Sequence, residues 1–431
     1  MPNTYLSRTF ASAGNRQSWT WSAWIKKTKV YNSTSSSDRA VWFGGYSGNN
    51  DTDWLEFGTQ GDVFYFTTNA IGNTGNRLMR DPNAWFHAVV TYDGSNLKFY
   101  HNNELDFNNT QLSGNRGINS AGTHTIGCMP KNAGTLRFFD GIMSHVHFVD
   151  GSVLAPSVFG QTDATTGEWK INVNPSYTLG TNGFFVLKDT NSGTDQSTNS
   201  NNFTAYGTLT KTEDCPSNVF ANINILDNHD FVGTFTNGNN TIASGSSSYS
   251  CCTSTLGMSS GKFYVEAKLS SGTTAIFGAT PKNPTSTGNN LGTSGFGIGV
   301  GENGRLRHEG TNTDSWSNTY TTNDILQVAL DLDNNKFYFG INGTWQNSAN
   351  PSTGTNGVTI LAPSSTYTEN YFFGFSDNNS TGGCTFQYNF GNGYFGTTAV
   401  SSAGTNASGI GIFEYDVPTG FTALSTKGLN L

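Results

Sequence analysis

The segment Ser18-Trp19-Thr20-Trp21-Ser22-Ala23-Trp24-Ile25-Lys26 decides the fold class, because its residues alternate in the way that a β-strand requires. Successive side chains of a strand point to opposite faces, so Trp19, Trp21, Ala23 and Ile25 would share one face. Such a face needs a second apolar sheet against it. The segment therefore predicts a strand of a β-sandwich.

A second segment, 261–269, repeats the alternation near the other end of the chain. Its residues divide into an inward set, Phe263, Val265, Ala267 and Leu269, and an outward set, Lys262, Tyr264, Glu266 and Lys268. Two further stretches, 89–103 and 328–343, echo each other: an apolar strand, a turn that begins with Asp, an aromatic strand and a turn containing Asn. We interpret both as hairpins with Asx-type turns, and infer that two sandwiches share one architecture.

The composition supports an all-β protein. Only 12% of the 431 residues are charged, 52 are glycine and 13% are aromatic, so strand and turn formers dominate over helix formers. This length predicts more than one domain. We expect two concanavalin A-like antiparallel β-sandwiches, at 1–161 and 232–431, the second ending in a C-terminal tail. An irregular connector, 162–231, would join them.

Several classes of partner are excluded by the sequence. The net charge is −8 and no Lys/Arg cluster exists, so we expect no nucleic acid partner. No apolar run approaches the ~20 residues of a membrane span, and the N-terminus has no signal-peptide pattern. The five cysteines are odd in number and form no Cys-x-x-Cys pair, so we expect free buried thiols.

Four stretches of the N-terminal region resemble laminin G-like/concanavalin A-like lectin domains: 19–26, Trp85-Phe86-His87-Ala88-Val89-Val90-Thr91-Tyr92-Asp93-Gly94, Phe139-Asp140-Gly141-Ile142 and Leu154-Ala155-Pro156. The C-terminal region resembles SPRY domains at 259–266, 296–299 and 328–345. The ending 411–421 is similar to the tails of SPRY-containing structural proteins of marine bacteriophages. These resemblances imply a virion surface component, such as a tail fibre or capsid decoration, made without a signal peptide.

Catalysis is not expected. Glucanases of the concanavalin A-like fold carry Glu-x-Asp-x-(x)-Glu on one strand, and Glu104-Leu105-Asp106-Phe107-Asn108-Asn109 lacks the final acid. An amide cannot act as the acid/base. His145 and His147, near Asp140 and Asp150, would supply too few ligands for a metal site. We therefore predict a protein that is not an enzyme, and keep a glucanase as the weakest alternative.

The candidate binding residues are aromatic and acidic residues among polar turns. Trp54 and Trp316 are candidate sugar-stacking residues, whereas Trp19, Trp21 and Trp85 belong to the core. Asp53, with Asp51, Asn49 and Asn50, forms an oxygen-rich loop. We expect no cofactor, with calcium at this loop as the alternative.

The function that follows is non-enzymatic adhesion at a virion surface, through binding of host-surface glycan or protein. The partners would be other virion proteins and the host surface, and the protein would be a homo-oligomer, with a trimer as one form. Multivalent display strengthens weak binding. The alternative is a purely structural cement or fibre component.

Overall fold

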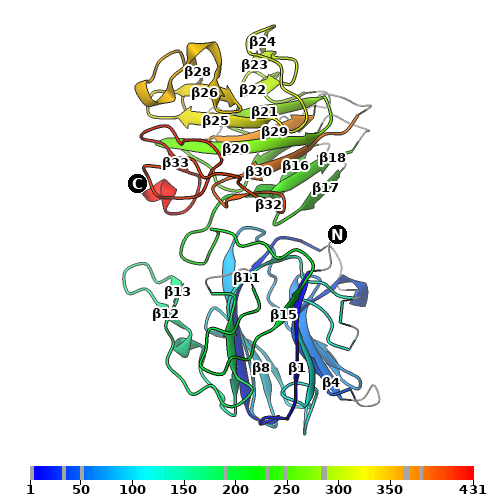
Figure 1. Ribbon diagram of the computed structural model, residues 1–431. Helices are drawn as coiled ribbons and strands as arrows, with labels where there is room; N and C mark the ends of the chain where they lie inside the picture. Colours follow the sequence, from blue (N-terminus) through cyan, green and yellow to red (C-terminus); the bar gives the residue numbers. More distant parts are fainter. Residues whose placement is uncertain are drawn as a thin grey trace. The chain divides into compact units, whose positions relative to one another are not determined.

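The computed structural model describes residues 4–31, 35–48, 53–131, 133–134, 136–188, 192–229, 233–245, 250–282, 289–363, 369–377 and 382–431. It is nearly all β, with 44% strand and 4% helix. The chain divides into two compact units, Met1–Lys211 (unit 1) and Thr212–Leu431 (unit 2), which we describe separately (Figure 1). The predicted all-β fold class, with concanavalin A-like β-sandwiches, is confirmed.

Unit 1 contains a seven-stranded and a six-stranded antiparallel sheet. The first follows the order β15 (Thr204–Tyr206), β1 (Tyr5–Phe10), β10 (Gly122–Ile126), β3 (Arg39–Tyr46), β4 (Trp54–Gln60), β5 (Val63–Thr68), β6 (Gly72–Thr74). The second follows the order β14 (Phe184–Val186), β11 (Gly141–Asp150), β2 (Trp19–Lys27), β7 (Trp85–Tyr92), β8 (Leu97–His101), β9 (Glu104–Asn109).

The core of unit 1 is built by inward side chains from both sheets. The four residues predicted to share a face of β2, Trp19, Trp21, Ala23 and Ile25, all belong to it. Trp21 is fully buried and its ring centroid lies 5.1 Å from that of Phe57 on the facing sheet. Aromatic rings in such contact add to the hydrophobic stabilisation that closes a sandwich. The predicted alternation is confirmed.

The outward face of β2 is buried as well. The covering segment follows β11 and includes the hairpin of β12 (Gly160–Thr162) and β13 (Trp169–Ile171). Trp169 Nε1 donates to His87 Nδ1 at 3.1 Å, and His87 Nε2 lies 2.8 Å from Ser22 Oγ. The buried side chains of His87 and Ser22 thereby have hydrogen-bond partners within the protein.

The segment 162–231, which we expected to be a separate connector, divides between the two units. Its strand β14 pairs with β11, and β15 pairs with β1, so both belong to the sheets of unit 1. Its strand β16 (Ile223–His229) pairs with β19 (Cys251–Ser254) in unit 2. Strands β14 and β15 contain three residues each, which is too short a run to show a periodic pattern of apolar residues.

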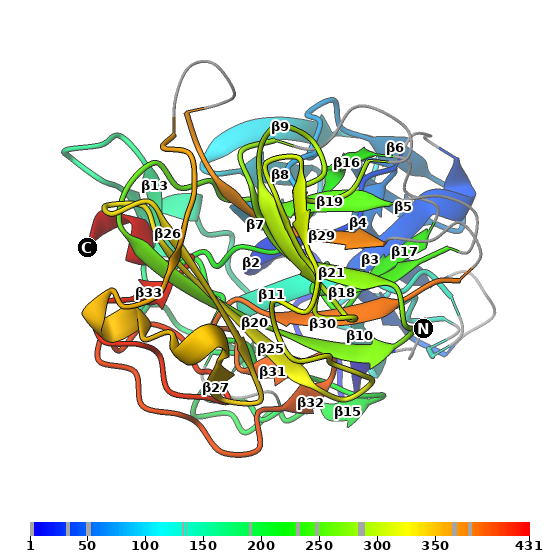
Figure 2. The ribbon, with the colours of Figure 1, turned by 90° about the horizontal axis from the view of Figure 1, so that it is seen from above.

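Unit 2 also contains two large antiparallel sheets. The first follows the order β16, β19, β29 (Phe372–Asp377), β21 (Ala275–Thr280), β22 (Ile298–Gly301), β23 (Leu306–His308), β24 (Thr311–Thr313). The second follows the order β17 (Gly233–Thr236), β18 (Thr241–Ser244), β30 (Thr385–Asn389), β20 (Lys262–Ser271), β25 (Ile325–Asp331), β26 (Lys336–Ile341), β27 (Thr344–Trp345). Figure 2 shows β30, β20 and β25 of this sheet side by side.

Short elements complete the described chain. Off the main order of the second sheet, β28 (Val358–Thr359) pairs with β26 and β33 (Thr422–Ala423) pairs with β20; β31 (Tyr394–Phe395) and β32 (Thr398–Ala399) pair with each other. Single 3₁₀ turns lie at Ser36–Asp38, Pro156–Val158, Gln346–Ser348, Pro351–Thr353 and Gly428–Asn430.

The two echoing hairpins form as predicted. Strands β7 and β8 pair antiparallel, and so do β25 and β26. Asp93 Oδ1 accepts from the backbone N–H groups of Ser95 and Asn96, and Asp331 Oδ1 accepts from that of Asn334. A carboxylate that satisfies turn amides in this way defines an Asx-type turn.

The C-terminal segment of unit 2 is part of the fold. Its strand β33 pairs parallel with β20 (Figure 1). The segment covers the face of β20 that the sequence predicted to point outward, so that Tyr264 and Glu266 are fully buried. A second small core, which includes Tyr264, Phe413 and Phe421, forms beneath it.

The five cysteines are free thiols. Cys128, Cys251, Cys252 and Cys384 are buried, and Cys215 is half-buried. Burial raises the pKa of the Cys128 thiol to about 11. Buried thiols of raised pKa are poor nucleophiles and behave as small apolar residues.

Candidate functional site

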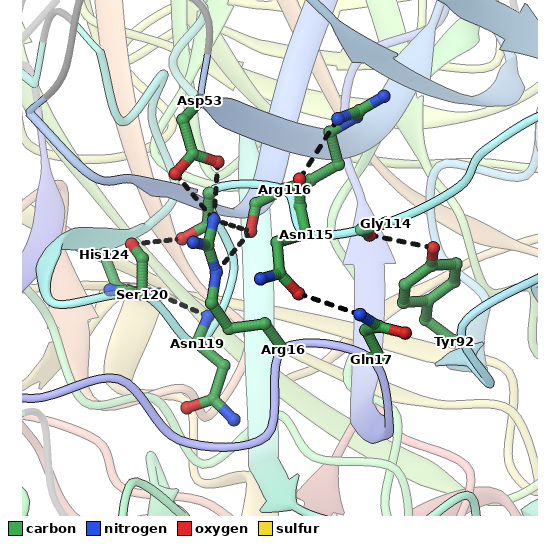
Figure 3. Close-up of polar contacts among 11 residues, drawn as sticks. Arg16, Gln17, Asp53, Tyr92, Gly114, Asn115, Arg116, Asn119, Ser120 and His124 are labelled. Atoms are coloured by element: carbon green, nitrogen blue, oxygen red, sulfur yellow. Dashed lines mark hydrogen bonds and ion pairs between the residues drawn. The ribbon is translucent and has the colours of Figure 1, made fainter.

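A cluster of polar side chains forms where loop 11–18 and loop 113–120 of unit 1 meet the start of β4 (Figure 3). We call its members the rim cluster: Arg16, Gln17, Asp53, Asn115 and Arg116. Arg16 Nη2 donates to both carboxylate oxygens of Asp53, at 2.5 and 2.6 Å, and to the carbonyl of Arg116 at 2.8 Å. The side chains of Arg16 and Asp53 are 17% and 24% exposed, so water screens this ion pair only in part.

A buried hydrogen-bond network supports the rim cluster from below. The carboxylate of Asp150, at the end of β11, accepts from Asn15 N at 2.7 Å and from Asn119 Nδ2 at 2.6 Å through Oδ1. Its Oδ2 accepts from Asn182 N at 3.1 Å. A Cβ on Gly14 would lie 2.3 Å from that same oxygen, so only glycine lets loop 11–18 approach this closely. The network holds loop 11–18 and loop 113–120 at fixed positions.

Tyr92 fixes the neighbouring turn. Its hydroxyl, on a side chain that is 1% exposed, lies 3.0 Å from the carbonyl oxygen of Gly114 (Figure 3) and 3.0 Å from that of Gly94. The turn after β7 and loop 113–120 are therefore tied together. Gln17 Nε2 donates to Asn115 Oδ1 at 3.3 Å, and both of these amides are exposed.

The structure separates the predicted binding residues. Asp53 lies in the rim cluster, but its neighbour Trp54 is only 8% exposed. The expected solvent-facing Trp54 ring is thus wrong: Trp54 lies in β4, paired with Tyr46, and Gly117 lies against its backbone. Trp316 belongs to unit 2, where it is half-buried and packs against the core. Asn49, Asn50 and Asp51 lie outside the described residues.

Arg16, Gln17, Asn115 and Arg116 were not predicted as site residues. The signal that could have found them is the repeated triplet Gly-Asn-Arg, at 14–16 and 114–116, which also occurs at 75–77. Two of the three copies meet in the rim cluster. A single triplet carries no information, and only the fold shows that loops 100 residues apart lie together.

The glucanase-like acids do not form a catalytic pair. Glu104 is largely exposed and ion-paired with Arg77, and Asp106 accepts from the backbone N–H of Arg77 at 3.1 Å. Asn108, at the place of the missing acid, is exposed. Retaining and inverting hydrolases need two carboxyl groups facing the same bond. Glu104 instead pairs with the guanidinium group of Arg77, and Asp106 accepts from the backbone of the same residue.

The two histidines of β11 do not form a metal site. His147 Nδ1 lies 2.5 Å from the hydroxyl of Tyr177, and its ring stacks on Phe185 at 3.9 Å. Asp150 is engaged by the amides described above. Within the described residues, no group of three or more His, Cys, Asp or Glu could hold a metal ion.

In the part of the chain that the structure describes, no helix is long and apolar enough to cross a membrane.

Comparison with known proteins extends the lectin-like resemblance of unit 1. The family model described as the concanavalin A-like lectin/glucanases superfamily matches residues 3–159. The laminin G-like/concanavalin A-like lectin fold is thus shown for this stretch. None of the curated proteins matches the chain significantly.

The solved structures to which parts of this chain are similar include two SPRY domains and a putative carbohydrate binding protein. The SPRY domain of human HERC1 is 14% identical, covering 38% of this chain and 96% of its own, with a TM-score of 0.32. A putative carbohydrate binding protein from Bacteroides ovatus is 18% identical, covering 47% and 56%, with a TM-score of 0.33. The TRIM65 PSpry domain is 13% identical, covering 39% and 91%, with a TM-score of 0.29. At these scores the similarity does not bear on function.

Proposed function

We propose that this protein is a non-enzymatic surface protein of a virus particle, a tail fibre or capsid decoration, that binds glycan or protein on the host surface. It would assemble with other virion proteins as a homo-oligomer. The observation that carries the binding activity is the rim cluster. Its exposed amides and its guanidinium groups are held by the hydrogen-bond network around Asp150.

Rigid amides suit a ligand rich in hydroxyl groups. Each amide offers both a donor and an acceptor, which matches a sugar hydroxyl. Because Asp150 and Asn119 fix the loops before a ligand arrives, little conformational entropy is lost on binding. The lectin-like fold of unit 1 supports the same class of ligand.

The test is a glycan array probed with the fluorescently labelled full chain. We expect binding to at least one glycan class, weakened by the double substitution Gln17→Ala and Asn115→Ala. A matched control is Asn96→Ala, which changes a neighbouring amide outside the cluster. Binding of the chain to isolated host envelope, and to virus particles that lack the protein, is measured as well. If the chain binds only to the particles, the adhesion proposal is wrong and the protein is a purely structural cement.

We propose that binding needs no cofactor, because the Asp53 carboxylate is already neutralised by Arg16. Chelation with EDTA should leave array binding unchanged. If EDTA abolishes binding and calcium restores it, the oxygen-rich loop at 49–53 is a calcium site and this part of the proposal is wrong.

A further inference from the structure

A second surface of unit 1 has the features of a sugar-binding platform. It lies on the outer face of the seven-stranded sheet, at the edge where β15 pairs with β1 (Figure 1). Leu6 and Phe10 of β1 point into the core, so the alternating positions Tyr5, Ser7 and Thr9 point outward. Register places Tyr206 opposite Tyr5 and Thr204 opposite Ser7.

The two tyrosines form a stacked pair with one ring exposed. The ring centroids of Tyr5 and Tyr206 are 4.6 Å apart and the planes differ by 4°. Tyr206 is nevertheless 45% exposed, and among the described residues of unit 1 it is the one aromatic side chain in the exposed large apolar set. Tyr5 covers one face of the Tyr206 ring, and Phe138 lies against Tyr5, with ring centroids 6.2 Å apart. The ring of Tyr206 is therefore held flat, with its other face toward solvent.

The edge strand that carries Tyr206 is anchored. Phe203, one residue before β15, is 5% exposed and its ring lies 4.7 Å from that of Phe184 in the core. Arg8 donates to Asn201 Oδ1 and to the Asn202 carbonyl, both at 2.7 Å. A rigid tyrosine offers apolar contact at small entropic loss.

The outward strand positions beside the ring are hydroxylic and uncharged. The outward positions that reach solvent on β15, β1 and β10 carry only tyrosine, serine and threonine: Thr204, Tyr206, Tyr5, Ser7, Thr9 and Thr123. Thr125, the next outward position of β10, is buried and donates to the carbonyl of Cys128. Thr9 Oγ1 and Thr123 Oγ1 lie 3.4 Å apart on this face. An anionic ligand would find no cation at these positions, whereas a neutral sugar finds an aromatic face for its C–H groups and hydroxyls for its own hydroxyls.

We infer that the exposed ring of Tyr206, with the outward hydroxyls of β15, β1 and β10, binds one ring of a neutral glycan chain. This surface is separate from the rim cluster, and the inference rests on the proposed function only in taking a glycan as the ligand.

The test is affinity electrophoresis of the full chain in gels containing one soluble polysaccharide each: laminarin, galactomannan, dextran or alginate. We expect at least one of the three neutral polysaccharides to retard the protein. Tyr206→Leu, which keeps an apolar side chain on Tyr5 but removes the flat ring, should weaken this binding by about tenfold. Tyr206→Phe should retain it. Tyr100→Leu, on a half-buried tyrosine of the other sheet, is the matched control.

The outcomes separate the two proposals. If the wild-type chain is retarded by a neutral polysaccharide and Tyr206→Leu is retarded equally, the platform is wrong while glycan binding stands. Retardation by alginate alone also overturns the platform. If no polysaccharide on the array or in the gels binds, glycan binding fails and the platform with it. If Tyr206→Leu instead changes the oligomeric state in size-exclusion chromatography without changing retardation, the surface is a contact between copies.

Discussion

The central strands β2 of unit 1 and β20 of unit 2 both lie buried on two faces, but the second face is covered by different chemistry. In unit 1 the cover is joined to the sheet through neutral rings, His87 with Trp169 and His147 with Tyr177. In unit 2 it is joined through a carboxylate. Glu266 accepts from the backbone N–H groups of Glu414 and Tyr415, at 2.9 and 2.8 Å.

Burial acts on these groups in opposite directions. Desolvation disfavours the charged form of any group. It lowers the pKa of His87 to about 3, and it raises the pKa of Glu266 to about 7 against four hydrogen bonds that favour the carboxylate. The covering segments therefore give the stability of the two units opposite dependences on pH.

The largest expected effect is a decrease in the folding stability of unit 1 in mild acid. Burial lowers the pKa of His101 and His124 to about 4, and that of His147 well below its usual range. Folded histidines stay neutral while unfolded ones protonate below about 6.5. The stability of unit 1 is therefore intact above pH 6.5 and falls as the pH drops toward 4, by on the order of a few kcal/mol per pH unit.

Tryptophan fluorescence measures this effect selectively, because seven of the nine tryptophans lie in unit 1. Urea titrations at pH 7.5, 6.5, 5.5 and 4.5 should show a falling midpoint. A control variant, His308→Gln in unit 2, should leave that trend unchanged. If the urea midpoint of unit 1 stays constant down to pH 4.5, the buried histidines do not make the stability of unit 1 depend on pH and the prediction is wrong.

A smaller effect of opposite sign is expected in unit 2. Because the folded pKa of Glu266 is raised, the folded state holds a proton that the unfolded state loses above about pH 4.5. Stability should fall as the pH rises from 4.5 through 7, by on the order of 3 kcal/mol. Glu266→Gln, which cannot ionise, should remove most of this slope.

Calorimetry of the full chain at pH 5 and pH 8 checks the Glu266 prediction through the thermal transition of unit 2. Asp314→Asn, on an exposed ion pair of the same unit, serves as the matched control. The prediction is wrong if the Glu266→Gln variant keeps the wild-type slope.

The smallest expected effect compares two ion pairs. Arg16–Asp53 in the rim cluster is partly shielded, whereas Arg305–Asp314 has side chains 37% and 71% exposed. Asp53→Asn should destabilise unit 1 by about 1 kcal/mol, and Asp314→Asn should leave unit 2 unchanged within error. Chemical denaturation at low salt and at 1 M NaCl provides the measurement. Equal losses in both variants would show that the rim cluster is not shielded.

Local pattern predicted much of the fold. The hairpins over 89–103 and 328–343 and the inward residues of β2 and β20 follow from alternation, because each strand has one face that must avoid water. The short strand β15 was harder, since its three residues contain too little pattern to distinguish a strand from a loop. Trp54 was misjudged because polar neighbours in sequence do not imply exposure in space.

The sequence by itself determined that the chain is all-β, where its long strands run and which side chains of those strands meet in the two cores, because alternation and composition act over a few neighbouring residues. Only the tertiary structure decided which loops form the rim cluster, that Tyr206 stacks on Tyr5, and that Glu266 is buried. Each of these depends on segments 100 to 200 residues apart, whose contact depends on the packing of whole sheets and has no local signature.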